Sequence, residues 1–108
     1  MSLASEEDIQ DFVDEVRDSF GDRISEIMLF GSYARDDYVP GSDIDILVLL
    51  NDEARKEDRD RAGELTGKYF EEKGLFFSPK LMNAEEFQEK KEEGYSFHQE
   101  VAEQGVKM

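Results

Sequence analysis

The fold of this chain is decided by the stretch FGSYARDDYVPGSDIDILV, which runs from Phe30 to Val48. It follows an apolar segment, turns at Gly31-Ser32, and leads into a second apolar segment that begins with two aspartates. Apolar runs of strand length that are bounded by turn residues are typical of strands buried on both faces. The stretch therefore predicts two strands, at 24–30 and 43–50, with a short helix at 32–37 and a loop between them.

Helical periodicity dominates most of the remaining chain. Ile9, Phe12 and Val16 belong to one apolar stripe, which Ser5 precedes as a candidate N-cap and Gly21 follows as a stop signal. This pattern predicts a helix at 5–20, and further helices are expected at 53–73, 83–93 and 96–105. In the 53–73 segment, the residues expected to face inward are Ala54, Ala62, Leu65, Tyr69 and Phe70.

A third strand is expected at 75–82. Pro79 lies within it and cannot donate to a hydrogen-bond ladder, which indicates an edge strand or an irregularity. The alternation of helices and strands predicts an α/β (α+β) fold, with a small mixed sheet of about three strands and flanking helices. A length of 108 residues fits a single domain that spans 1–108.

The composition excludes several classes of function. Aspartate and glutamate number 28 against 13 lysines and arginines, which gives a formal charge of −15. Such a charge argues against binding to nucleic acid or to an anionic membrane, since both need clustered cations. The absence of cysteine excludes a disulfide framework, and no apolar run approaches the roughly 18 residues of a membrane span. We expect a cytoplasmic protein, and the acidity also favours a halophilic origin, because concentrated salt screens carboxylate repulsion.

Two features of the central stretch carry chemistry. At Gly31-Ser32 the backbone can turn sharply and approach a ligand, and Ser32 offers an amide and a hydroxyl to an anion. Asp43 and Asp45 alternate with Ile44, so in a strand both project from one face, about 6.5–7 Å apart. Two anions beside an apolar sheet are costly unless a cation lies between them, and Mg²⁺ commonly takes one or two carboxylates plus substrate phosphates.

Each feature has a plainer interpretation when taken alone. Gly-Ser is a common turn pair, and two aspartates can simply lie in solvent at the start of a strand. Together they supply the parts for nucleotidyl transfer: a turn that grips a triphosphate, and carboxylates that hold Mg²⁺. Arg35 is a further candidate for the triphosphate, unless it only pairs with Asp36 or Asp37 on the surface. His98, the single histidine, is expected on a helix surface near a partner interface.

This arrangement resembles a known family. Phe30-Gly31-Ser32, followed after ten residues by Asp43-Ile44-Asp45-Ile46, is similar to the signature of the DNA-polymerase-β-like nucleotidyltransferase superfamily. Tyr33-Ala34-Arg35, Ser42 and the tail from Gly94 to Val106 also look like the family. At this length the chain most resembles the minimal nucleotidyltransferases (MNT) of archaea and bacteria, and the acidity suggests a haloarchaeal member.

The resemblance implies a minimal nucleotidyltransferase fold and a division of roles. Gly31 and Ser32, with Arg35, would bind the nucleotide, while Asp43 and Asp45 would be the catalytic residues and the Mg²⁺ ligands. MNT proteins are often paired with HEPN-domain toxins, and some transfer AMP from ATP to the toxin. The implied partners are therefore ATP or another nucleoside triphosphate and a HEPN protein, and a homodimer is an open alternative for the assembly.

The chain departs from the family at one important place. Active members usually carry a third acidic residue on the later strand, which helps to activate the attacking hydroxyl. The segment 75–82 contains no aspartate or glutamate, and Ser78 or Lys80 would occupy that neighbourhood. Glu26, Asp36 or Asp37 could substitute in space. An alternative function is therefore a catalytically weak antitoxin that neutralises a HEPN ribonuclease by direct contact.

Overall fold

The computed structural model describes residues 3–108. Its central element is a four-stranded mixed sheet with the strand order β3-β2-β1-β4. The strands are β1 (Ile24–Phe30), β2 (Ile44–Leu50), β3 (Phe77–Asn83) and β4 (Val106–Lys107). β1 pairs antiparallel with β2 and with β4, whereas β2 and β3 are parallel. A parallel pair needs a crossover connection, and the long helix α3 (Lys56–Lys73) supplies it.

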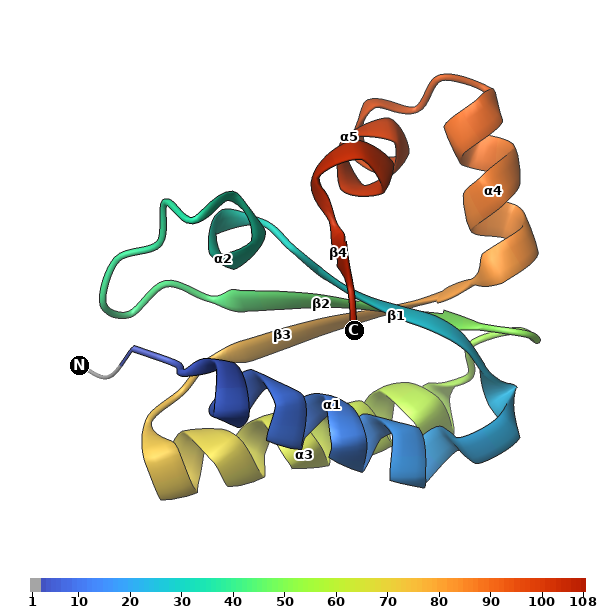
Figure 1. Ribbon diagram of the computed structural model, residues 1–108. Coiled ribbons are helices and arrows are strands. Elements are labelled where there is room, and N and C mark those ends of the chain that lie inside the picture. Colours follow the sequence, from blue (N-terminus) through green and yellow to red (C-terminus); the bar gives the residue numbers. More distant parts are fainter. Residues whose placement is uncertain (1–2) are drawn as a thin grey trace.

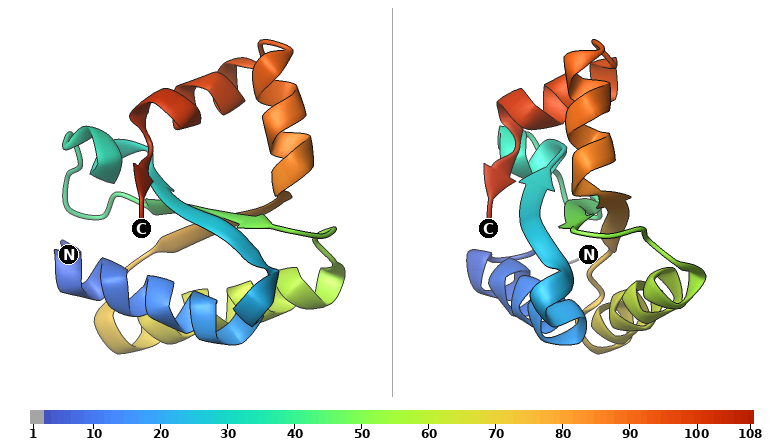
Figure 2. Two further views of the ribbon diagram at one scale, coloured as in Figure 1. Left: turned by 45° about the vertical axis from the view of Figure 1, so that its right-hand side comes forward. Right: turned by 90° about the vertical axis from the view of Figure 1, so that its right-hand side faces the viewer.

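Helices cover both faces of the sheet (Figures 1 and 2). α1 (Glu6–Phe20) and α3 lie side by side on one face, and α4 (Ala84–Glu92) and α5 (Ser96–Gln104) form a second layer on the other. A 3₁₀ turn (Gly21–Arg23) leads from α1 into β1, and the one-turn helix α2 (Ser32–Arg35) follows β1. Within residues 3–108, no helix has the length and apolar content that a membrane span requires.

β2 is the centre of the molecule and packs on both faces. Its even-numbered residues Ile44, Ile46, Val48 and Leu50 join the core under α1 and α3. Leu47 and Leu49 belong to the second core, under α4 and α5. The alternation expected of a strand covered on both sides is therefore confirmed, and burial of each large apolar side chain contributes about 1.5–3 kcal/mol.

Aromatic side chains tie the first layer of helices to the sheet. The Phe12 ring of α1 stacks on Phe77 of β3 with the ring centroids 4.1 Å apart, and it meets Tyr69 of α3 edge-on at 5.2 Å. Tyr69 is buried as predicted, but the expectation for Phe70 is wrong. Phe70 is 49 % exposed and packs against Phe76, itself partly exposed, because α3 turns that face away from the sheet.

Most elements begin or end a few residues from their expected positions. α2 ends at Arg35 because Asp36 adopts the left-handed conformation, with φ at 62°. α3 begins at Lys56, since the Asp58 carboxylate accepts a hydrogen bond from the Arg55 amide at 2.9 Å and fixes the helix start. β2 begins at Ile44 rather than Asp43, and β3 spans 77–83 rather than 75–82.

The two edge strands of the sheet also differ in whether the sequence predicted them. β3 is an edge strand, which agrees with the position of Pro79. β4 was not expected at all: its two residues Val106 and Lys107 pair with β1, opposite Leu29 and Met28. Gly105 permits this return, because a Cβ there would lie 2.5 Å from the Val101 carbonyl oxygen.

Candidate active site

The turn after β1 is built around the backbone of Gly31. Gly31 has φ at 73° and ψ at −153°, a region that is essentially restricted to glycine. Its carbonyl oxygen accepts hydrogen bonds from the amides of Ala34 and Arg35, both at 3.1 Å. Ser32, partly exposed, is the first residue of α2, so the glycine and the serine form one closed turn at the end of β1.

Asp45 lies directly against this turn. Phe30 and Asp45 are paired in the β1–β2 register, which places the aspartate beside the end of β1. A Cβ atom built on Gly31 would lie 2.1 Å from Asp45 Oδ2, so any other side chain would displace the carboxylate. The glycine of one motif and the second aspartate of the other therefore meet in space, although 13 residues of chain separate them.

Asp43 stands immediately before β2 and is exposed to solvent. Burial raises the pKa of Asp45 above its ordinary value, and the negative charge of Asp43 raises that pKa further. The nearby positive charges of Lys80 and Arg35 act in the opposite direction. Within residues 3–108 neither aspartate is in an ion pair, so their negative charge is available to a ligand.

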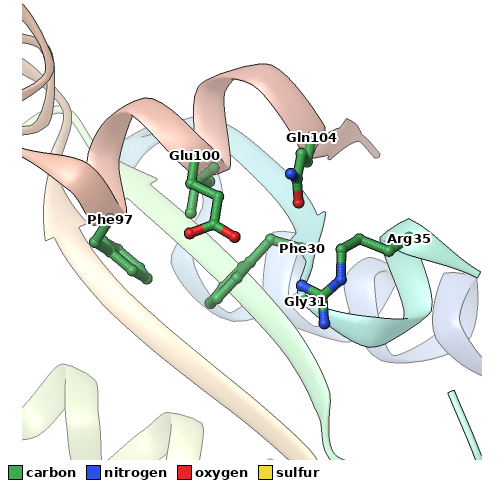
Figure 3. A pocket seen from close by; sticks show the side chains of 7 residues that line it. Phe30, Gly31, Arg35, Phe97, Glu100 and Gln104 are labelled. Carbon is green, nitrogen blue, oxygen red and sulfur yellow. The ribbon is translucent and has the colours of Figure 1, made fainter. Parts of the chain in front are cut away.

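Arg35 follows the turn and points back toward it (Figure 3). Its Nε is 3.1 Å from Asp37 Oδ2, in the surface ion pair that was the plainer expectation for this residue. The same side chain also lines a cavity of about 170 Å³ between the turn and α5. The Asp37 pair is exposed on both sides, and such a pair contributes little stability, so it does not hold the Arg35 side chain firmly.

α5 contributes site residues that sequence reasoning missed. Phe97, Glu100 and Gln104 line the cavity beside Gly31, with the Glu100 carboxylate turned into it (Figure 3). They lie more than 60 positions after Gly31, and no motif or spacing connects them with it. His98, by contrast, was expected on a surface and is buried among the rings of Phe87, Tyr95 and Phe97; burial lowers its pKa.

β3 offers no third carboxylate. In the parallel register Ser78 lies opposite Asp45 and Lys80 opposite Leu47. Glu26, considered as a substitute, pairs with Lys107 and lies opposite Leu49, four positions along β2 from Asp45. In the part of the chain that the structure describes, no three acidic, histidine or cysteine side chains are grouped closely enough to hold a metal ion.

The remaining donor set can still take a divalent cation. Mg²⁺ keeps several water ligands and is commonly held by one or two carboxylates together with substrate phosphates. Asp43 and Asp45 supply two neighbouring carboxylates that form no ion pair within residues 3–108, which suits an ion shared with a nucleotide better than an ion held by protein alone. The geometry thus defines the class of a nucleotidyltransferase-like site.

Comparison with known proteins assigns the family. The chain belongs to the nucleotidyltransferase domain family, which it matches over residues 9–107. It is 37 % identical over 103 residues to a protein of Methanocaldococcus jannaschii named "putative protein adenylyltransferase", with 95 % of this chain and 96 % of that protein covered. Two further proteins of the same organism with that name match shorter parts of the chain.

Solved structures share the fold. The crystal structure of a toxin–antitoxin with AMP-PNP superimposes with a TM-score of 0.62 at 23 % identity, covering 91 % of this chain and 70 % of that chain. A mutant of the toxin–antitoxin MntA-HpeT gives a TM-score of 0.56 at 23 % identity, covering 92 % and 69 %. The fold class expected from the sequence is confirmed by these structures.

Proposed function

We propose that this protein transfers AMP from ATP to a hydroxyl group on a partner protein in the cytoplasm, the partner being a HEPN toxin. The observation that carries the proposal is the contact between Asp45 and Gly31, which unites a phosphate-binding turn with a pair of carboxylates. Further support comes from membership of the nucleotidyltransferase domain family and from the names of the archaeal relatives.

In this proposal each residue has one task. Gly31 and Ser32 receive the phosphates of the nucleotide at the turn that closes β1, where the partly exposed Ser32 offers its amide and its hydroxyl. Arg35 contacts the triphosphate, and Asp43 and Asp45 hold Mg²⁺. Mg²⁺, when bound, supplies charge stabilisation at the phosphoryl oxygens.

The reaction itself is a simple exchange at phosphorus. The acceptor oxygen forms a bond to the α-phosphorus, the bond between the α- and β-phosphates breaks, and pyrophosphate leaves while the acceptor loses its hydroxyl proton. The residues described above bind and orient the nucleotide for this exchange. Orientation of the reactants can by itself supply several kcal/mol of the rate enhancement.

A second function is favoured by a specific observation. β3 presents Ser78 and Lys80 at the positions beside Asp45 and Leu47, and no third acidic group joins the aspartates within the described residues. A site without that group would transfer slowly. The alternative is an antitoxin that retains the fold and neutralises a HEPN ribonuclease by direct contact.

Labelled ATP distinguishes the two functions. The protein is incubated with α-labelled ATP, Mg²⁺ and the protein encoded beside it, in parallel with the variant Asp43→Asn/Asp45→Asn. Label on the partner that disappears with the variant supports transfer. Neutralisation of the partner without label, unchanged by the variant, supports the binding module; if neither occurs, the assignment of the partner is wrong.

Thermal unfolding tests nucleotide binding without any partner. A ligand that binds only the folded state stabilises it by about 2.7 kcal/mol at a concentration of 100 times Kd. We therefore expect the melting temperature to rise at saturating Mg–ATP in the wild-type protein and to stay constant in the double variant. An unchanged melting temperature in the wild type would contradict the site.

A further inference from the structure

We propose that Lys80 of β3 is a nucleotide-binding residue whose ammonium group binds the β- and γ-phosphates beside Asp45. This inference rests on the proposed function, and it assigns a role to the strand position at which the site offers no acidic group. It extends the site from the turn and β2 onto a third element of the fold.

The sheet register places Lys80 on the correct face. Phe77 belongs to the core under α1 and α3, whereas Met82 packs into the second core, under α4 and α5. Because side chains alternate along a strand, Lys80 shares the face of Met82. Asp45 shares the face of Leu47, which belongs to that same second core, so Lys80 and Asp45 project from one side of the sheet.

The separation along this face suits a ligand that touches both residues. Lys80 lies opposite Leu47, one strand away from and two residues beyond Asp45. With about 4.8 Å between strands and about 3.3 Å per residue, the two Cα atoms are roughly 8 Å apart. A lysine side chain can span that interval, and the charge of Lys80 does act on Asp45, since it lowers the pKa of that carboxyl.

Lys80 is also free to bind an anion. Its side chain is exposed, and within residues 3–108 it forms no ion pair, although the chain has 28 acidic residues. Lys56, Lys68, Lys73 and Lys107 all pair with carboxylates. A triphosphate adds negative charge beside two aspartates, and Lys80 and Arg35 are the cations whose charge reaches Asp45. The ammonium group of Lys80 thus reduces the repulsion between the triphosphate and the two aspartates, which one divalent cation would not cancel by itself.

The test compares nucleotides that differ only in the phosphate tail. Isothermal titration calorimetry measures binding of ATP and of AMP, each with Mg²⁺, to the wild-type protein, Lys80→Gln and Lys80→Arg. We expect Lys80→Gln to weaken the binding of ATP at least tenfold, which is the effect of one charge-assisted hydrogen bond. The same variant should weaken the binding of AMP less than twofold. Lys80→Arg should keep most of the affinity for ATP.

Lys56→Gln is the matched control, because it removes the same charge from an exposed lysine at the start of α3, at the other end of the sheet. It should leave both affinities unchanged, and circular dichroism verifies that every variant is folded. If Lys80→Gln weakens the binding of ATP and AMP equally, or weakens neither, the assignment of Lys80 is overturned. The proposed function is not affected by that result. A wild-type protein that binds no Mg–ATP overturns both.

Discussion

Aspartates lie at both ends of the β1–β2 strand pair, but an arginine pairs with them at one end only. At the end where β1 begins, the guanidinium of Arg23 donates to both oxygens of Asp58 at 2.7 and 2.8 Å, and its Nε donates to Asp52 at 3.1 Å. At the end where β1 stops, Asp43 and Asp45 have no such partner within residues 3–108. One set of aspartates is paired with an arginine, and the other forms no ion pair in the part of the chain that the structure describes.

The pKa values report this difference. Hydrogen bonds from Arg23 hold the pKa of Asp58 far below its usual range, whereas burial and the charge of Asp43 raise that of Asp45. A lowered pKa in a carboxylate means that the fold stabilises its charge, and a raised one means that the fold opposes it. The ion pairs of Arg23 therefore stabilise the folded protein. The charge of Asp45 lowers the stability of the folded protein, and such a carboxylate is suited to binding a ligand.

The largest effect is expected at Gly31. In Gly31→Ala the new Cβ would meet Asp45 Oδ2 and the backbone would keep a conformation that only glycine tolerates, so the free energy of unfolding should fall by about 3 kcal/mol. Gly74→Ala is the matched control, because Gly74 also has a positive φ but nothing lies within 4 Å of its Cβ position. It should cost about 1 kcal/mol. Urea denaturation measures both, and equal losses would contradict the close contact.

Asp58→Asn should have the next largest effect. It removes a hydrogen-bonded charge pair and should lower the free energy of unfolding by about 2 kcal/mol near pH 7. Because the pKa of Asp58 is lowered on folding, this stability is present above its ordinary pKa and is lost as the pH falls below about 4.

Denaturation from pH 7 down to pH 3 measures the difference between wild type and Asp58→Asn. The difference should shrink steadily below pH 4. Asp60→Asn, in the same helix, breaks only an exposed pair with Lys56 and should change stability by less than ~0.5 kcal/mol. A pH-independent difference at Asp58 would show that the ion pair is not its source.

Asp45→Asn should act in the opposite direction. It removes a partly buried charge that Asp43 repels, so we expect the protein without ligand to gain about 1 kcal/mol, or about 4 °C in melting temperature. Asp14→Asn, at an exposed position of α1, makes the same change in net charge and should leave the melting temperature almost unchanged. A lower melting temperature for Asp45→Asn would mean that the carboxylate stabilises the fold.

The smallest effect concerns salt. The chain carries a formal charge of −15, and molar salt reduces the screening length to about 3 Å. If the acidity reflects a halophilic origin, the melting temperature should be higher in molar KCl than in dilute buffer, by roughly 3 °C. Equal melting temperatures in both would remove the halophile hypothesis.

Sequence patterns predicted the elements whose cause is local. The apolar run over 44–50 predicted β2 as a strand buried on both faces, and the stripe from Ile9 to Phe20 predicted α1. The patterns failed where distant segments decide the structure. Two residues of β4 pair with β1 only because α5 returns there, and Phe70 is exposed because of the direction in which α3 packs. Neither fact has a signal in the local periodicity.

The candidate site also contains both residues that the sequence predicted and residues that only the fold brings together. The types and spacing of Gly31, Ser32, Asp43 and Asp45 follow from the sequence alone, because they lie in one stretch with a strand on either side. Glu100 and Gln104 enter the cavity from α5, which lies far along the chain. The position of Lys80 depends on the register between β2 and β3, and that register is set by side chains that pack on both faces of the sheet.

The sequence by itself thus determined the motif and the order of the helices and the first three strands, because backbone periodicity and glycine conformation act over a few residues. Only the tertiary structure decided that the Asp45 carboxylate lies against the Gly31 backbone, and that Arg23 pairs with Asp58 while burial and the charge of Asp43 raise the pKa of Asp45. These contacts depend on strand register and helix packing, which are properties of the whole chain.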